Sequence, residues 1–445
     1  MIDIPSLQNS IVKFIKSKKP TSYAVKIVKS KHHQFRFYNN NPAAAKFWDE
    51  LEISIFFERE KRLVGSTLYV SQEARIEEIL AKLDAFSKII SPKEDFVGLA
   101  KGPFEYKPFA NNFDKKMEDL SEIGPEIVHT AITKAIESGA RRVAGVLKGE
   151  IEEIYLVTSN DVNASDKNSR VYLHLRAFTG DEATGMGSTA GRFVEHLEVE
   201  KIAEEAGEKA KISERPITID SGKYDVILSR PALGNLLGYA GISASAFSVE
   251  LGYSFFIDKL DKRVGSDLVT LYDDGRAIDG MNSRLFDDEG VPTQKTVIID
   301  HGVVKSFLHN TTTAVKFDTE TTGNAGIIQP MPWNIILAPG DFTEEELLSE
   351  IKYGIYIENA TYTRFQNIAK GDFSSILRDG IFLIENGELT KAIKGARLSD
   401  NMLNIFKNVD GVGKDLKQVY HWWMQVPVYA PKIRARNIGI SRSTL

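Results

Sequence analysis

The most distinctive pattern of apolar and polar positions lies in residues 222–247, where a short apolar strand runs directly into a helix. Residues 224–228 are β-prone, Ser229 suits an N-cap, and Pro231 falls in the first turn, where its missing N–H costs nothing. A helix with one face in a core has apolar residues at the spacing i, i+3, i+4. This spacing occurs here at Leu233, Leu236, Leu237, Ala240, Ala244 and Phe247. We therefore predict a helix that packs tightly in a core.

This helix also contains three glycines, Gly234, Gly238 and Gly241. Each glycine inside a helix costs roughly 1 kcal/mol relative to alanine. Small residues continue through 243–246. The pattern predicts that another segment, or a ligand, approaches the backbone of this helix closely.

The N-terminal half alternates between helical and strand-like patterns. Helices are predicted over residues 2–18, 72–90, 115–138 and 195–210, with Ile11, Val12, Phe14 and Ile15 on the apolar side of the first and Ile76, Ile79, Leu80, Leu83 and Phe86 facing inward in the second. Strands are predicted at 22–28, 34–38, 52–57, 63–70, 142–147, 151–158 and 169–178. The segment 159–169 is rich in residues that bond their own backbone, which predicts a solvated loop.

Beyond residue 247 the pattern is rich in strands. Two hairpins are predicted, with turns at 300–302 and 385–387, together with a capped helix at 343–352, a strand at 354–357, a helix near 399–408, and an interface or final strand within 418–440. The fold class is therefore α+β: an N-terminal α/β-sheet domain followed by a strand-rich C-terminal domain with a curved antiparallel sheet. We place the domains at 1–215, with 1–110 and 111–215 as alternative lobes, and at 216–445.

Composition and charge narrow the possible functions. With 56 basic and 61 acidic residues, the chain has no basic stripe of the kind that nucleic-acid binding requires, so we expect no nucleic-acid partner. No stretch approaches 18 unbroken apolar residues and the N-terminus lacks a signal peptide, so we expect no membrane association and a cytoplasmic location. The absence of cysteine excludes disulfides, thiolate nucleophiles and cysteine zinc ligands.

The usual catalytic signatures are missing. No two of the eight histidines are spaced i, i+4 on a predicted helix, and the adjacent His32 and His33 would point to opposite faces of a strand. The GMGSTAG segment within 179–191 has the wrong spacing for a dinucleotide loop, and there is no GxSxG nucleophile or phosphate loop. We predict no catalytic residues, no metal and no cofactor on the chain itself.

Three polar clusters in the C-terminal half remain. They are turns between strands on the simplest interpretation, and on the functional one their small and hydrogen-bonding residues hold an extended peptide. The candidate peptide-binding residues are Asp287, Asp288 and Glu289 in the first cluster, Thr322, Gly323 and Asn324 in the second, and Asp372, Phe373 and Ser374 in the third.

At these segments the chain resembles the TldD/PmbA family, also called the modulator-of-DNA-gyrase family. The resemblance covers most of the C-terminal half in matching order and spacing, whereas the N-terminal half is similar mainly in layout. The similar segments include GKYDVILSRPALGNLL (222–237), TLYDDG (270–275), SRLFDDEGVPTQ (283–294), TTGNAG (321–326) and GDFSSILRDG (371–380).

The resemblance implies that TldD-like members hold zinc through HExxxH on the helix and a later cysteine. Aligned after Leu237, the motif falls on Gly238, Tyr239 and Ser243, so both histidines and the glutamate are replaced. The chain therefore resembles the PmbA/TldE type, a subunit that lacks zinc and pairs with a TldD-like metallopeptidase around a cavity where extended, unfolded peptides are cut. Two alternatives stay open: a homodimeric peptide- or protein-binding scaffold, and an independent hydrolase that uses Asp287, Asp288 or Asp372.

Overall fold

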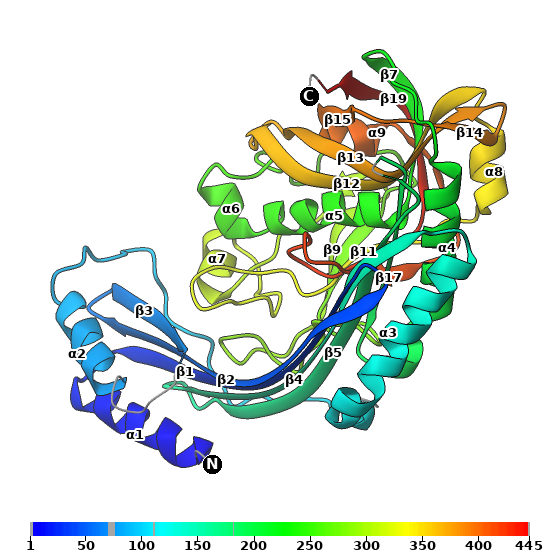
Figure 1. Ribbon diagram of the computed structural model, residues 1–445. Helices are drawn as coiled ribbons and strands as arrows, with labels where there is room; N and C mark the ends of the chain where they lie inside the picture. The colour runs from blue at the N-terminus through cyan, green and yellow to red at the C-terminus, as the bar shows by residue number, and fades with distance from the viewer. Residues whose placement is uncertain (1–2, 70–75, 110–111, 181, 444–445) are drawn as a thin grey trace.

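The computed structural model describes residues 3–69, 76–109, 112–180 and 182–443. Its N-terminal half is built on a six-stranded antiparallel sheet in the order β3-β2-β1-β4-β5-β6, which curves around the C-terminal half (Figure 1). The strands are β1 (Ser22–Tyr38), β2 (Asn41–Arg59), β3 (Arg62–Tyr69), β4 (Arg142–Thr158), β5 (Asn163–Phe178) and β6 (Thr184–Gly191).

These strands are longer than the sequence pattern predicts. The separate runs 22–28 and 34–38 join into β1, and 142–147 and 151–158 join into β4. The polar residues that interrupt the pattern are accommodated because they find partners within the sheet: the His32 ring, for example, stacks on Trp48 at 4.6 Å. In these strands, polar residues interrupt the apolar pattern without ending the strand, because the two faces of the sheet contact different parts of the protein.

The prediction of a solvated loop at 159–169 is wrong from residue 163 onward, where β5 begins. Asp166 and Ser169 are buried in this strand. Asp166 accepts hydrogen bonds from Asn112 and from the Leu285 N–H, and Ser169 Oγ donates to the Arg192 carbonyl. Turn-forming residues can occupy a strand because distant segments satisfy their polar groups.

Helices cover the convex face of this sheet (Figure 1). They are α1 (Ile4–Ser17), α2 (Ile76–Phe86), the 3₁₀ turn η2 (Lys115–Asp119), α3 (Leu120–Glu137), the 3₁₀ turn η3 (Val194–His196) and α4 (Val199–Ile212). Ile11 and Ile15 are buried as predicted. Phe86 is not: it is 57% exposed, because α2 ends there. Residues 72–75 of the second predicted helix lie outside the described residues.

The C-terminal half contains two further sheets. One has the order β10-β9-β8-β11-β18-β17, formed by β8 (Leu271–Asp274), β9 (Lys295–Asp300), β10 (Val303–Val304), β11 (Ile335–Leu337), β17 (Lys417–Val419) and β18 (Val428–Ala430). The other has the order β12-β7-β19-β15-β13-β14, formed by β7 (Gly222–Leu228), β12 (Tyr353–Asn367), β13 (Asp372–Glu385), β14 (Glu388–Ala392), β15 (Ala396–Asn401) and β19 (Ile433–Arg442), with β16 (Val409–Val412) on β19. Pairing of β12 with β13 closes five of these strands into a ring. The α+β class with a strand-rich C-terminal half is confirmed.

Several local predictions in this half are confirmed and two are revised. The hairpin turn at 385–387 joins β13 to β14, and Thr343 and Glu346 form the predicted capping box of α8 (Glu344–Ser349). The helix predicted at 399–408 is only α9 (Met402–Lys407), because residues through Asn401 pair in β15. Residues 372–374, predicted as a turn, begin β13.

Helix α5 (Arg230–Ser243) lies at the centre of the C-terminal core and is buried on most sides, as its sequence predicts. The short helices α6 (Ala246–Glu250) and α7 (Thr311–Lys316) lie nearer the concave face of the N-terminal sheet (Figure 1). In the part of the chain that the structure describes, no helix combines the length and the apolar character needed to span a membrane.

Candidate functional site

The three positions where the related zinc motif would fall lie on α5, and two of them make contacts within the protein. Tyr239 donates from its hydroxyl to the Thr363 carbonyl at 3.3 Å, and its ring meets Phe365 edge-on. Ser243 is buried, and its carbonyl accepts from Ser254 Oγ at 2.6 Å. Gly238 offers no side chain. This donor set does not fit zinc, which takes imidazole, thiolate or carboxylate ligands. Across the described ranges, no group of three or more His, Asp or Glu side chains could hold a metal ion.

The three glycines of α5 have different surroundings. A Cβ at Gly234 would lie 2.6 Å from Val419 Cγ2, and one at Gly241 would lie 2.6 Å from Ile335 Cδ1. Both positions match the predicted close approach to the helix backbone. At Gly238, in contrast, the nearest atom would be the Val426 carbonyl oxygen at 4.0 Å. Position 238 therefore has room for a side chain although none is present.

This difference gives a matched test within one helix. Gly238→Ala should raise the free energy of unfolding by about 0.5–1 kcal/mol, because alanine favours the helix and meets open space. Gly241→Ala should lower it by about 1–2 kcal/mol, because Ile335 must move. Urea unfolding of both variants measures the two signs, and destabilisation by Gly238→Ala would show that the space is not available.

The first two predicted clusters meet in one buried network. Asp287 Oδ1 accepts from the Glu289 and Val291 N–H groups, and Oδ2 accepts from Ala325 N–H at 2.8 Å, which joins the two loops. Asn324 donates to Asp273 Oδ2 at 2.6 Å. Asp273, which the search for site residues missed, also accepts from the backbone of residues 333 and 334. These side chains hold the protein's own loops together.

The remaining members of these clusters are also bonded within the chain. Asp288 forms an ion pair with Lys26 at 2.6 Å, across the boundary between the N-terminal sheet and the C-terminal half. Thr322 exchanges hydrogen bonds with the backbone of His309. Gly323 has φ of +66°, and a Cβ there would strike the backbone at Pro292, so the loop requires glycine. Within the described part of the chain, Asn324 Oδ1 is buried without a hydrogen-bond partner.

The third cluster lies in a different place, in the seven-stranded sheet. Asp372 accepts from Asn401 Nδ2 at 2.8 Å, and Ser374 bonds Ser399 on the neighbouring strand β15. Phe373 is buried in the C-terminal core beside Phe365. Asp372 is only half-buried. Thus the structure brings two of the three clusters together and separates the third from them.

Burial controls the charge of the network. It raises the pKa of Asp273 to about 7 and that of Glu289 to about 7. Burial, together with the nearby Glu289 carboxyl, also raises the pKa of Asp287 well above its ordinary value. Since the folded-state pKa of Asp273 exceeds its ordinary value, the stability gained from its proton is complete below about pH 4 and is lost as the pH rises toward 7.

Asp273→Asn should remove this pH dependence. One pKa unit corresponds to about 1.4 kcal/mol, so the wild-type protein should lose about 3 kcal/mol relative to the variant between pH 5 and pH 8. Urea unfolding of both proteins at the two pH values measures this difference. A difference that does not change with pH would contradict the raised pKa.

The contacts between the two halves also contain polar residues that the sequence search did not identify. Arg176 on β5 donates to Asp379 Oδ1 through Nε at 2.9 Å, and Asp379 Oδ2 accepts from Asn359. The rings of His174 and His421 are 5.6 Å apart, and burial lowers the pKa of His174 to about 4 and of His421 to about 3, so both are neutral near pH 7. Alternation along β5 predicts its two faces but cannot identify these partners.

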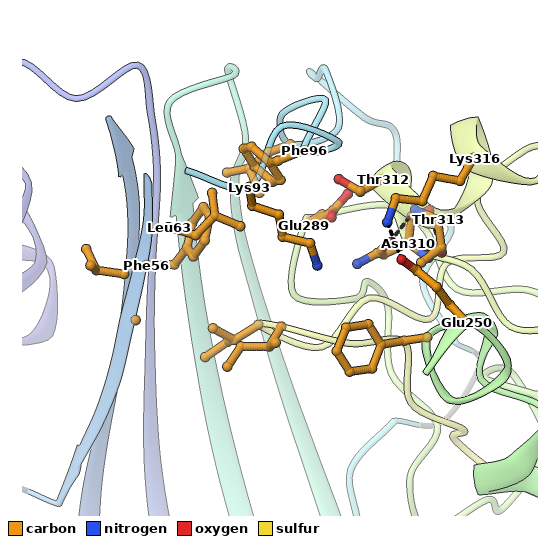
Figure 2. Close-up of a pocket in the computed structure, with 16 residues that line it drawn as sticks. Phe56, Leu63, Lys93, Phe96, Glu250, Glu289, Asn310, Thr312, Thr313 and Lys316 are labelled. Carbon is orange, nitrogen blue, oxygen red and sulfur yellow. Dashed lines mark hydrogen bonds and ion pairs between the residues drawn. The ribbon is translucent and has the colours of Figure 1, made fainter. Parts of the chain in front are cut away.

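A cavity of about 190 Å³ opens beside the buried network, between the N-terminal sheet and the C-terminal half (Figure 2). Glu289 is the one predicted site residue in its lining. The lining residues come from three parts of the chain: Phe56, Leu63, Val64 and Gly65 from β2 and β3; Lys93, Phe96 and Leu99 from the following connection; and Phe247, Glu250, Glu289, Asn310, Thr312, Thr313, Lys316, Ile327 and Ile328 from the C-terminal half.

Comparison with known proteins identifies the family. Two family models match the chain: the PmbA/TldA metallopeptidase central domain over residues 106–214 and the PmbA/TldA metallopeptidase C-terminal domain over residues 221–442. A metalloprotease of Methanothermobacter thermautotrophicus is 30% identical over 342 residues, which cover 72% of this chain and 74% of the relative. A metalloprotease of Methanocaldococcus jannaschii is 40% identical over 202 residues, so the match spans only 44% of each protein.

Solved structures share the fold over nearly the whole chain. TldE from Thermococcus kodakarensis has a TM-score of 0.82 at 21% identity and covers 98% of this chain and 99% of its own. A candidate modulator of DNA gyrase from Thermotoga maritima has a TM-score of 0.85 at 22% identity and covers 99% of this chain and 100% of its own. These structures show the fold, and the family models together with the 30% identical metalloprotease show that the chain belongs to the PmbA/TldD family of metallopeptidase homologues.

Proposed function

We propose that this protein is the non-catalytic, zinc-lacking subunit of a TldD/TldE-type metallopeptidase complex that degrades or processes unfolded peptides. The observation that carries the proposal is that α5 lacks zinc ligands at the positions where the related motif has them. The strand–helix unit of a metallopeptidase family is retained, whereas residues 238, 239 and 243 offer neither a zinc ligand nor a general base. The similarity to a TldE structure supports the same assignment.

In this proposal the partner subunit supplies the zinc, and this chain supplies the opposite wall of a peptide-cutting chamber between the two subunits. This chamber is distinct from the cavity of about 190 Å³ within the chain. Asp372 is half-buried at a strand end, whereas the equally half-buried Asp288 is paired with Lys26, so Asp372 is the carboxylate that we assign to substrate. Asn324 is fully buried and bonded to Asp273, and it acts on peptides only by holding its loop in place.

The test is co-purification from the native cell, followed by metal analysis and peptide cleavage. We expect a partner containing HExxxH, zinc in the complex, cleavage of an unfolded peptide by the pair, and loss of that cleavage with a chelator. The isolated chain should not cleave the peptide. Repeated recovery of the chain without such a partner would favour the homodimeric scaffold, and chelator-insensitive cleavage by the chain alone would favour an independent hydrolase.

Asp372→Ala should lower the kcat/KM of the assembled pair for peptides by about tenfold, the effect of losing one hydrogen bond to a charged group. Pair formation, measured by size-exclusion chromatography, should be unchanged. Asp261→Ala is the matched control, because the Asp261 side chain is 77% exposed. Wild-type cleavage by the Asp372→Ala pair would remove this residue from the proposed site.

A further inference from the structure

The cavity in Figure 2 has an apolar wall and a polar wall. Phe56 and Leu99 are buried, and the rings of Phe56 and Phe96 are 5.8 Å apart. With Phe247 and Ile327 they line a space of about 190 Å³. An engineered apolar cavity of about 150 Å³ binds benzene, so this space suits one aromatic or branched aliphatic side chain.

The two lysines of the cavity differ in their partners. Lys316 is paired with both Asp95 and Glu250. The Lys93 ammonium lies 5.3 Å over the Phe247 ring, and it forms no ion pair with any residue that the structure describes. In Figure 2 it points into the space between the walls. Among the lining residues that the structure describes, Lys93 is therefore the cation that an incoming anion can neutralise.

Two further groups can bind an anion or a carbonyl. Thr312 is 7% exposed, and its hydroxyl is buried without a hydrogen-bond partner among the residues that the structure describes. Asn310 uses its side-chain oxygen to accept from the Thr313 N–H, which leaves its amide nitrogen directed into the cavity (Figure 2). A buried hydroxyl that makes no hydrogen bond is unfavourable, and a ligand that accepts from it would remove that penalty.

The carboxylates that line the cavity do not cancel its preference for an anionic ligand. Glu250 is bonded to Lys316 at 2.7 Å. Glu289 Oε2 accepts from the N–H groups of Ala100 and Thr311 and from the Thr311 hydroxyl. Burial raises the pKa of Glu289 to about 7, which reduces its negative charge at neutral pH.

We propose that this cavity binds a carboxylate attached to an apolar side chain, and that its natural occupant is the carboxy-terminal residue of a peptide. The apolar side chain would fill the space between Phe56, Phe96 and Phe247, and the carboxylate would meet Lys93 and Thr312. The ligand chemistry follows from the cavity, whereas its assignment to a peptide rests on the proposed function.

Calorimetric titration of the purified full-length chain tests this proposal. The probes are an acetylated pentapeptide that ends in phenylalanine with a free carboxylate, the same peptide with a carboxamide end, and N-acetyl-phenylalanine. We expect the free acid peptide to bind at least about tenfold more tightly than the amide, because a hydrogen-bonded charge pair contributes about 1.5–3 kcal/mol. Equal affinities, or no binding by any probe, would overturn the proposal. Binding of N-acetyl-phenylalanine with exclusion of the pentapeptide would overturn the peptide assignment.

Two variants connect binding to the named groups. Lys93→Met retains the apolar stem and should weaken binding of the acid peptide by about tenfold or more, whereas Lys101→Met, at an exposed position outside the lining, should not. Thr312→Val should weaken binding while leaving the melting temperature equal or higher, because it removes an unpartnered hydroxyl. Unchanged binding by Lys93→Met would overturn the assignment; if that variant fails to fold, Lys93→Gln replaces it. The titration uses no partner subunit, so failure to recover a metallopeptidase partner would leave its result intact.

Discussion

Arg192→Met is expected to lower the free energy of unfolding by about 3–5 kcal/mol. The Arg192 side chain is 2% exposed, and it donates to the carbonyls of Asn112, Gly280 and Ser283. Each buried carbonyl left without a donor costs about 1–3 kcal/mol, although such costs do not add fully. Since these carbonyls belong to the segment before α3 and to the loop after β8, the arginine connects the two halves of the chain.

Urea unfolding measures this effect, with Arg141→Met as the matched control. The Arg141 side chain is 77% exposed and lies 3.5 Å from Glu214, so its loss should change stability by less than about 0.5 kcal/mol. Arg192→Lys keeps the charge but loses the forked donors, and it should still destabilise the protein. Equal stabilities for the Arg192 and Arg141 variants would show that water replaces the guanidinium without cost.

Gly187→Ala is expected to cost about 3 kcal/mol. Helix α4 crosses β6 so closely that a Cβ at Gly187 would clash with the Ile202 carbonyl oxygen and lie 2.9 Å from its carbon. A Cβ at Gly185 would similarly lie 2.8 Å from the Ala210 nitrogen. Because backbone atoms cannot move away by changing rotamer, the helix itself must shift, and overpacking of this kind costs about 1–3 kcal/mol or more.

The control for Gly187→Ala is Gly180→Ala, since no atom of the described residues outside its chain neighbours lies within 4 Å of a Cβ at position 180. Thermal unfolding should separate the two variants by several degrees, because 1 kcal/mol changes Tm by about 2–4 °C in proteins of 150–250 residues and by less in longer ones. Similar melting temperatures would mean that α4 is not held against β6. The same close approach explains the GMGSTAG segment: it lies within β6, and its glycines at 185 and 187 let α4 approach the strand.

Patterns that are local in sequence predicted the fold well. The Thr343 capping box, the 385–387 turn and the helix after Ser229 depend on residues within one or two turns of each other. Predictions failed where distant partners changed the outcome. Residues 163–169 form a strand because the Leu285 N–H and the Arg192 carbonyl satisfy Asp166 and Ser169.

The candidate site divides in the same way. The sequence placed Asp287 and Glu289 among the polar residues of interest, but their burial and their bonds to Ala325, Ala100 and Thr311 depend on the fold. Asp273 is one of two adjacent aspartates in TLYDDG, and nothing in the neighbouring sequence distinguishes it as the one on which three donors converge. The cavity could not be predicted, since it joins residues as distant as Phe56 and Thr312.

The sequence by itself determined which functional groups this protein possesses: no cysteine anywhere, and glycine, tyrosine and serine at positions 238, 239 and 243. Only the tertiary structure decided which groups meet, and it placed Lys93, which has no ion-pair partner among the described residues, and the buried Thr312 hydroxyl in the lining of one cavity. The physical reason is that side-chain chemistry belongs to each residue alone, whereas burial, pKa and proximity arise from contacts between segments far apart in the chain.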